Sequence, residues 1–160
     1  MLLFNSREIG IDMGHRVPNH NGKCKSQHGH RYRIIAHITG PLQEKGSSQG
    51  MVLDFGFLKE IMGVIVDVFD HANCLWYKDP KVKVVIPDFE ERMFSESEDK
   101  AFIKDDTLEG KVVVIGAVPT AENLAIIWGD LIREQILKEG CELVKMEVWE
   151  TPFSKVEVIF

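Results

Sequence analysis

The sequence predicts a single α+β domain in which an antiparallel four-stranded sheet carries two helices on one face. Its 160 residues, 44% of them hydrophobic, can bury one sizeable core. Four segments alternate apolar and polar residues as strands do, and two segments between them repeat apolar residues at helical spacing. The order strand, strand, helix, helix, strand, strand favours an antiparallel sheet, because parallel sheets come from alternating strands and helices.

The first two strands flank a loop rich in turn-forming residues at 18–27. Alternation from Ile9 to His15 predicts the first strand. In the second strand, before Gly40, one face is formed by His28, His30, Tyr32, Ile34, Ala36 and Ile38. Two histidines therefore sit at one end of a face that is otherwise apolar.

The two helices follow from their apolar spacing and their caps. Asp54 can cap the first helix, which ends near Asp70-His71, and its apolar positions are Leu58, Ile61, Met62, Ile65 and Phe69. Thr120 can cap the second helix, which extends to about Gly140.

The last two strands alternate in the same way as the first two. Val144, Met146 and Val148 precede Glu150 on one strand, and a further strand follows the turn at Pro152. The two strands complete the predicted sheet.

An acidic insertion interrupts this plan at about 78–112, so that the domain covers residues 1–160 with one added segment. Residues 88–109 hold nine acids against three bases, which leaves the rest of the chain neutral overall. Residues 112–115 have the composition of a strand, and the insertion can form its own hairpin.

Residues 13–43 contain no acid, five bases and five of the six histidines. Such a positive field favours an anionic substrate, although solvated loop charges would give the same pattern. A nucleic-acid surface is not expected, because the bases are few and no aromatic residues are interleaved with them. No apolar run could cross a membrane and no signal-peptide pattern is present. Three widely spaced cysteines indicate no disulfide framework, which favours a cytoplasmic location.

The spacing of His28 and His30 predicts a metal site. Residues two apart on a strand point to the same side, and a third imidazole from His15 would complete a set that suits Zn²⁺ with an open fourth position. Cys24 lies between Lys23 and Lys25, which favour its thiolate, so it could remove a proton from a carbon beside the metal. Alternatively, Cys24 is the fourth ligand of a closed structural site.

Two further acidic positions are candidates for chemistry. Asp70 could orient His71 for proton transfer, although a histidine at a helix end is common for electrostatic reasons. Glu150 ends an apolar strand face and could accept two hydrogen bonds from the guanidine-like edge of a heterocycle. The alternative is an ordinary acid exposed to water at a strand end.

Taken together, the motifs resemble those of the 6-pyruvoyl-tetrahydropterin synthase family, and in particular its bacterial 6-carboxy-tetrahydropterin synthase branch. The matching segments span nearly the whole chain in order: residues 14–16, 24–32, 50–55, 58–59, 70–73, 119–125 and 148–151. The insertion at about 78–112 departs from the compact members of that branch. It could cover the pocket, add a subunit contact or alter the choice of substrate.

The resemblance implies a tunnelling fold whose subunits join their sheets into a barrel, usually as a hexamer built from two trimers. It implies zinc bound by His15, His28 and His30. Catalytic roles would fall to Cys24 as the base and to Asp70 and His71 as the acid–base pair, and substrate-binding roles to Glu150 as the pterin anchor and to Glu122.

The implied reaction converts 7,8-dihydroneopterin triphosphate to 6-carboxy-5,6,7,8-tetrahydropterin, with release of acetaldehyde and triphosphate, in queuosine biosynthesis. The three-residue gap between Cys24 and His28 favours this carbon–carbon lyase. The alternatives are a pyruvoyl-type synthase, a phosphorus–oxygen lyase that eliminates triphosphate but keeps the carbon chain, and a non-catalytic zinc- or pterin-binding protein.

Overall fold

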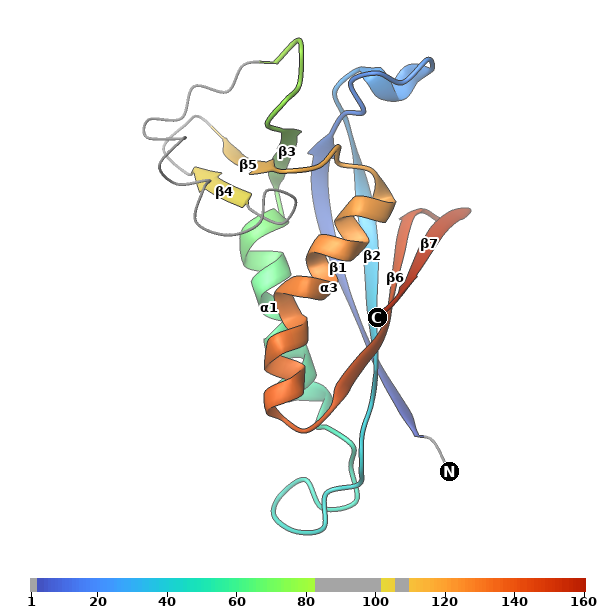
Figure 1. Ribbon diagram of the computed structural model, residues 1–160, viewed down its shortest axis with the longest axis vertical. Coiled ribbons are helices and arrows are strands. Elements are labelled where there is room, and N and C mark those ends of the chain that lie inside the picture. The colour runs from blue at the N-terminus through green and yellow to red at the C-terminus, as the bar shows by residue number, and fades with distance from the viewer. Residues whose placement is uncertain (1–2, 83–101, 106–109) are drawn as a thin grey trace.

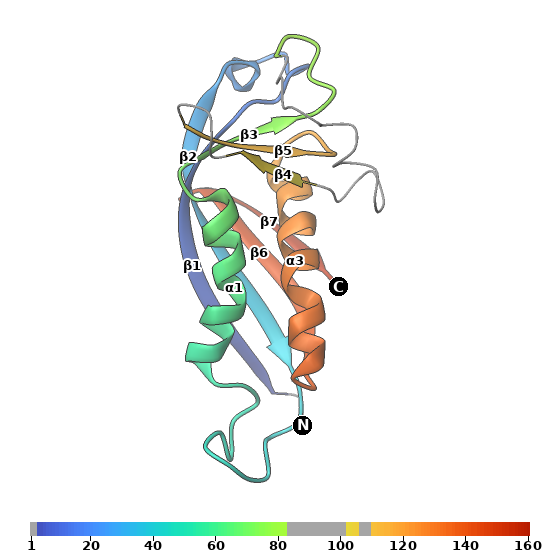
Figure 2. The ribbon, with the colours of Figure 1, turned by 90° about the vertical axis from the view of Figure 1, so that its left-hand side faces the viewer.

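The computed structural model describes residues 3–82, 102–105 and 110–160. Two helices lie side by side on one face of a curled sheet (Figures 1 and 2). The strands are β1 (Phe4–His15), β2 (His28–Thr39), β3 (Ala72–Trp76), β4 (Phe102–Asp105), β5 (Lys111–Ile115), β6 (Glu142–Thr151) and β7 (Ser154–Ile159). The helices are α1 (Phe55–Phe69) and α3 (Ala121–Lys138), with a short 3-10 helix at Lys23–Lys25.

The four predicted strands are neighbours in the order β1-β2-β6-β7, and every pair among these neighbours is antiparallel. The sheet is nevertheless larger than predicted, because β3, β5 and β4 extend it beyond β1. The pairs β1–β3 and β3–β5 are parallel, so the whole sheet is mixed. With only five residues and a largely apolar sequence, β3 shows no alternation by which it could be distinguished from the end of α1.

Part of the predicted insertion enters this extension. Residues 112–115 form a strand as predicted, within β5, and β5 pairs antiparallel with β4. Residues 83–101 and 106–109 of the insertion lie outside the described residues.

Both predicted helices are confirmed together with their caps. The carboxylate of Asp54 accepts hydrogen bonds from the backbone amides of Gly56 and Phe57 at 2.8 and 3.1 Å. The hydroxyl of Thr120 accepts from the amide of Asn123 at 3.4 Å. These bonds satisfy amides of the first turn that have no partner inside the helix.

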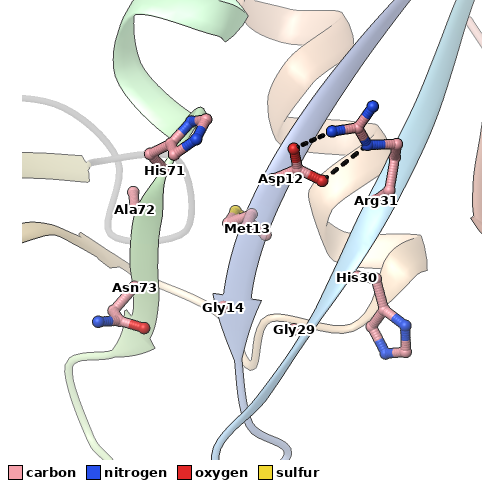
Figure 3. Close-up of a pocket in the computed structure, with 9 residues that line it drawn as sticks. All are labelled: Asp12, Met13, Gly14, Gly29, His30, Arg31, His71, Ala72 and Asn73. Atoms are coloured by element: carbon pink, nitrogen blue, oxygen red, sulfur yellow. Dashed lines mark hydrogen bonds and ion pairs between the residues drawn. The ribbon is translucent and has the colours of Figure 1, made fainter.

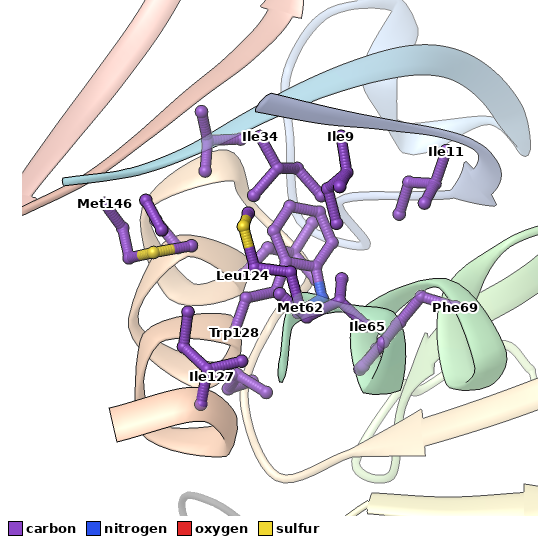
Figure 4. Close-up of a cluster of buried hydrophobic side chains, with 14 of the residues drawn as sticks. Ile9, Ile11, Ile34, Met62, Ile65, Phe69, Leu124, Ile127, Trp128 and Met146 are labelled. Carbon is purple, nitrogen blue, oxygen red and sulfur yellow. The ribbon is translucent and has the colours of Figure 1, made fainter. Parts of the chain in front are cut away.

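The core lies between the helices and the sheet (Figure 4). Trp128 of α3 is fully buried and meets Phe69 of α1 and Tyr32 of β2 edge-on, at ring-centroid distances of 5.7 and 5.6 Å. Around these rings pack Ile9, Ile11, Ile34, Met62, Ile65, Leu124, Ile127 and Met146. This packing holds β1 and β2 in place next to the end of β1 and the start of β2, where the predicted site lies.

The opposite, outer face of β1 and β2 is polar. Cross-strand ion pairs join Arg31 to Asp12 and Arg33 to Glu8. Gly14 faces Gly29 across the same two strands, and a side chain at Gly14 would collide with the amide oxygen of Asn73 on β3. The glycine therefore leaves room for the side chain of Asn73 beside β1.

One buried ion pair ties the end of β1 to the segment before the insertion. Arg16, which directly follows His15, lies with its Nε 3.4 Å from the buried carboxylate of Asp79. Asp79 also accepts backbone hydrogen bonds from Lys81 and Val82 at 2.9 and 3.2 Å. Within the described ranges, neither helix has the length and apolar character that a membrane-spanning segment requires.

Candidate functional site

Three imidazoles converge where β1 ends and β2 begins. The antiparallel register places His15 directly opposite His28, and His30 follows two residues later on the same face. The ring centroids lie 4.6 Å apart for His15–His28, 5.3 Å for His15–His30 and 5.0 Å for His28–His30. One ring nitrogen from each histidine lies within 4.8 Å of the other two, so the three residues could hold a metal ion.

Backbone carbonyls orient two of these rings. Nδ1 of His15 lies 2.6 Å from the carbonyl oxygen of Pro119, and Nδ1 of His28 lies 2.8 Å from that of Ser26. Because a carbonyl oxygen only accepts, each Nδ1 carries the proton and each Nε2 keeps its lone pair, as a metal ligand requires. Burial lowers the pKa of His15, which also favours the neutral ring. The donor set therefore fits a divalent cation.

A cavity of about 360 Å³ opens beside His15 and gathers four of the predicted site residues. Its lining includes His15, Cys24, Glu122 and Glu150. Glu122 lies in the first turn of α3 and Glu150 near the end of β6. Segments more than 100 residues apart in the chain thus place a metal-ligand candidate, a thiol and two carboxylates around one space.

Glu150 is held at the edge of the histidine cluster. Its Oε1 lies 3.5 Å from Nε2 of His15 and accepts a hydrogen bond from the hydroxyl of Tyr32 at 3.1 Å. Burial, followed by the nearby carboxylate of Glu150, raises the pKa of Tyr32, so this hydroxyl stays protonated. Glu150 is thus a partly buried carboxylate with a hydrogen-bond partner and not a solvated acid at a strand end.

Cys24 lines two cavities at the site. It is free and half-buried, and besides the cavity beside His15 it lines a larger one of about 800 Å³ together with His28 and His30. Lys23 and Lys25 line that larger cavity as well. Among the described residues, the cluster with mutually close ligand atoms contains the three histidines without Cys24.

The predicted positive field is weaker than the sequence indicates. Three of the five bases in the acid-free stretch, Arg16, Arg31 and Arg33, pair with acids from elsewhere in the chain. Lys23 and Lys25 form no ion pair within the described part of the chain. The positive charge next to the histidine cluster is therefore that of these two lysines.

Asp70 and His71 form a close pair directly after α1. Nδ1 of His71 donates to Oδ2 of Asp70 at 2.9 Å, and Oδ1 of Asp70 accepts from the backbone amide of Asp12 at 2.8 Å. Burial alone would raise the pKa of Asp70, but these hydrogen bonds lower it below its ordinary value. The ionised carboxylate thus fixes the ring of His71 and leaves its Nε2 available in a side chain that is 77% exposed.

Within the same chain, the pair shares no cavity with Cys24, Glu122 or Glu150, although His30 lines the cavity of His71 as well. His71 lines a separate cavity of about 430 Å³ on the outer face of the sheet, together with Asp12, Arg31 and Asn73. Figure 3 shows β1 lying between His71 and the ring of His30. Cys24 lines the other two cavities and not this one. Within one chain, the structure therefore separates Asp70 and His71 from Cys24.

Two side chains at the site had not been predicted to belong to it. Tyr32 stands on the same strand face as the two histidines, so alternation placed it correctly, but its contact with Glu150 joins residues 118 positions apart. His20 lines the cavity beside His15, and its Nδ1 accepts a hydrogen bond from the amide of Gly22 at 2.9 Å. Its place in a turn-rich loop gave no periodicity from which to infer this.

The chain is similar to known proteins over nearly its whole length. The family model described as 6-pyruvoyl tetrahydropterin synthase matches residues 5–159. The chain is 31% identical over 153 residues to the 6-carboxy-5,6,7,8-tetrahydropterin synthase of Haemophilus influenzae, covering 95% of each protein. It is 32% identical over 146 residues to a probable 6-carboxy-5,6,7,8-tetrahydropterin synthase of Halobacterium salinarum, covering 91% of this chain and 79% of that protein.

Solved structures show the same fold. An uncharacterized protein from Wolinella succinogenes superposes with a TM-score of 0.80 at 26% identity, covering 99% of this chain and 98% of that one. The 6-pyruvoyl tetrahydropterin synthase of Caenorhabditis elegans superposes with a TM-score of 0.64 at 20% identity, covering 100% of this chain and 96% of that one. The similarity extends over the whole chain in both cases.

Proposed function

Because this chain belongs to the 6-pyruvoyl tetrahydropterin synthase family, we propose that it is a zinc-dependent 6-carboxy-5,6,7,8-tetrahydropterin synthase. It would convert 7,8-dihydroneopterin triphosphate to 6-carboxy-5,6,7,8-tetrahydropterin and release acetaldehyde and triphosphate, as a step towards queuosine. The observation that carries this proposal is the single cavity lined by His15, Cys24, Glu122 and Glu150 beside a three-histidine cluster.

The residues of the cluster suit zinc. Three neutral imidazoles are a common catalytic zinc set and leave one position open. Bound there, the ion would polarise an oxygen of the substrate side chain and so make the adjacent carbon more acidic. The position of Cys24 outside the tight cluster supports the open site over a closed one with four protein ligands.

Each remaining residue has a distinct task in this proposal. Cys24 borders the cavity beside His15 and takes a proton from the substrate side chain as its thiolate. Glu150 accepts two hydrogen bonds from the amino-pyrimidine edge of the pterin, and Glu122 contacts the ring from the first turn of α3. Lys23 and Lys25 supply the charge that attracts the triphosphate, which is the part of the substrate with the most negative charge.

Asp70 and His71 complete the site from a second copy of the chain. The sheet of one subunit separates this pair from Cys24, so in an assembly the pair of one subunit would face the cavity of another. The edge strand β7 supports such an assembly, because no strand among the described residues pairs with its outer side and Ile159 on it is 69% exposed. The assembly we propose is a hexamer of two trimers with sheets joined into a barrel.

Product analysis tests the proposed reaction. Zinc-loaded protein is incubated with 7,8-dihydroneopterin triphosphate, and the products are identified by mass. We expect acetaldehyde and a pterin with a carboxyl group at position 6. A product that keeps the three-carbon side chain would contradict the lyase and identify the pyruvoyl-type synthase, after which the family model is named.

Replacing Cys24 distinguishes an enzyme from a structural zinc protein. A catalytic base predicts that Cys24→Ala keeps its zinc and its melting temperature but loses turnover by about 100-fold or more. Cys74→Ala is the matched control, because Cys74 is fully buried and lines none of the three cavities around the site. Loss of zinc from Cys24→Ala would instead identify the thiol as a ligand.

A further inference from the structure

Tyr32 occupies the space between the histidine cluster and Glu150. It stands on β2 two residues after His30, and its side chain is fully buried. Its ring centroid lies 5.9 Å from that of His15 and 5.8 Å from that of His30. On its other side the ring meets Trp128 edge-on at 5.6 Å. With core packing on one side and imidazoles on the other, the phenol ring cannot move without disturbing both.

The hydroxyl proton of Tyr32 has one suitable acceptor. A buried hydroxyl needs a partner, and three atoms lie within reach: Oε1 of Glu150 at 3.1 Å and the two ring nitrogens of His15 at 3.3 and 3.4 Å. Nδ1 of His15 already donates to the carbonyl of Pro119, and Nε2 of His15 is the nitrogen that faces the cluster. The carboxylate is both the nearest acceptor and the strongest, because it is charged.

This hydrogen bond restricts how Glu150 can present its carboxylate. The Glu150 side chain is 28% exposed and borders the cavity, so without a partner its carboxylate could rotate. A carboxylate has roughly four lone-pair positions, and one hydrogen bond at Oε1 fixes its plane while leaving Oε2 and the second lone pair of Oε1 free. Two N–H donors side by side on a planar heterocycle need such a fixed pair of oxygens.

We propose that Tyr32 is a positioning residue whose hydroxyl fixes Glu150 for the two adjacent N–H donors of the ligand. This inference rests on the proposed function, because it assumes that Glu150 binds the pterin edge. It adds a selectivity role for a core residue: ligands that present two parallel donors benefit from the fixed carboxylate, whereas ligands with a single donor gain little from it. The hydroxyl acts through Glu150 and touches neither the ligand nor the reacting atoms.

Tyr32→Phe tests this role, because it removes only the hydroxyl and keeps the ring packing against Trp128. The probe is 6-carboxypterin, a fluorescent oxidised pterin, titrated into zinc-loaded protein. We expect the dissociation constant to rise about tenfold, and KM for 7,8-dihydroneopterin triphosphate to rise in parallel with a much smaller change in kcat. Zinc content should remain as in the wild type. Tyr77→Phe is the control, since Tyr77 lines none of the three cavities around the site.

A double-mutant cycle shows whether the hydroxyl acts through Glu150. In the background of Glu150→Gln, Tyr32→Phe should leave the already weakened affinity for 6-carboxypterin unchanged. An equal tenfold loss in both backgrounds, or loss of zinc from Tyr32→Phe, would overturn the inference. Wild-type affinity for 6-carboxypterin in Tyr32→Phe would also overturn the inference, but it would leave the proposed function intact. If the wild-type protein neither binds 6-carboxypterin nor converts the triphosphate, the proposed function fails and this inference fails with it.

Discussion

At the scale of single residues, the arrangement of His15 and His28 depends on partners that only the folded chain supplies. Alternation along β2 was sufficient to predict that His28 and His30 share a face, and alternation along the first strand placed His15 on the matching face. The ring orientation of His15, however, comes from the carbonyl of Pro119, which is 104 positions away. No local pattern in the sequence could have identified that acceptor.

The histidine cluster leads to a direct prediction about metal content. His28→Ala should reduce bound zinc from one ion per chain to nearly none after dialysis, because two remaining imidazoles bind far more weakly than three. Metal content is measured by inductively coupled plasma mass spectrometry. His20→Ala is a matched control, since His20 borders the cavity but lies outside the cluster, and it should keep its zinc. Full zinc occupancy in His28→Ala would contradict the ligand assignment.

A histidine on the outer face of the sheet predicts how stability depends on pH. Burial, and then the positive charge of Lys145, lower the pKa of His37, although Glu147 and Glu157 oppose the change. The unfolded chain therefore binds more protons than the folded chain as the pH falls through about 6.5, so the folded state should lose stability from pH 7 to pH 5.

His37→Asn tests this prediction by removing the titrating group. Urea unfolding at pH 7, 6 and 5 should show a smaller loss of the free energy of unfolding for the variant than for the wild type. Comparing the two proteins cancels the contribution of other titrating groups, including the buried His15, whose pKa is also lowered. Equal slopes for both proteins would show that His37 contributes nothing.

At the scale of the elements, the proposed acid–base pair directly after α1 includes a residue with a strained backbone. His71 has a φ of 57°, in the left-handed region that residues with a Cβ rarely adopt. Its amide donates to the carbonyl of Asp12 at 2.7 Å, and Asp70 accepts from the amide of Asp12, so β1 holds the turn in place. A strained residue held by its surroundings is a common feature of functional sites.

The strain predicts different stabilities for two variants that both lack the imidazole. His71→Gly should be more stable than His71→Ala by about 1 kcal/mol, because glycine adopts positive φ without a steric cost. Both variants should lose turnover if His71 transfers protons. Thermal unfolding followed by circular dichroism gives the stability difference. Equal stability of the two variants would show that the backbone relaxes at this position.

At the scale of the whole molecule, the two halves of the proposed site lie on opposite faces of the sheet. If a second copy supplies Asp70 and His71, two inactive variants should complement each other. Equal amounts of Cys24→Ala and His71→Ala, unfolded together and refolded, should regain about a quarter of the wild-type activity, because a random assembly pairs intact halves in that proportion. Steady-state turnover measures the recovery.

The control for this experiment keeps both substitutions in one chain. A mixture of wild-type protein with the double variant Cys24→Ala/His71→Ala contains the same numbers of intact and altered groups and shows whether assembly is random. Mixed oligomers, verified by mass, that recover no activity would contradict a site shared between copies.

The sequence alone determined the strands β1, β2, β6 and β7, the two capped helices and the three histidines that could hold a metal ion. All of these depend on local periodicity or on side-chain chemistry, which neighbouring residues fix. It did not determine the three-strand extension of the sheet, because β3 is short and its partners are distant in the chain. Only the tertiary structure decided that Tyr32 meets Glu150, that three arginines are neutralised by acids from other segments, and that Asp70 and His71 face away from Cys24. Those outcomes depend on which strands become neighbours and on which face of the sheet each side chain lies, and long-range packing sets both.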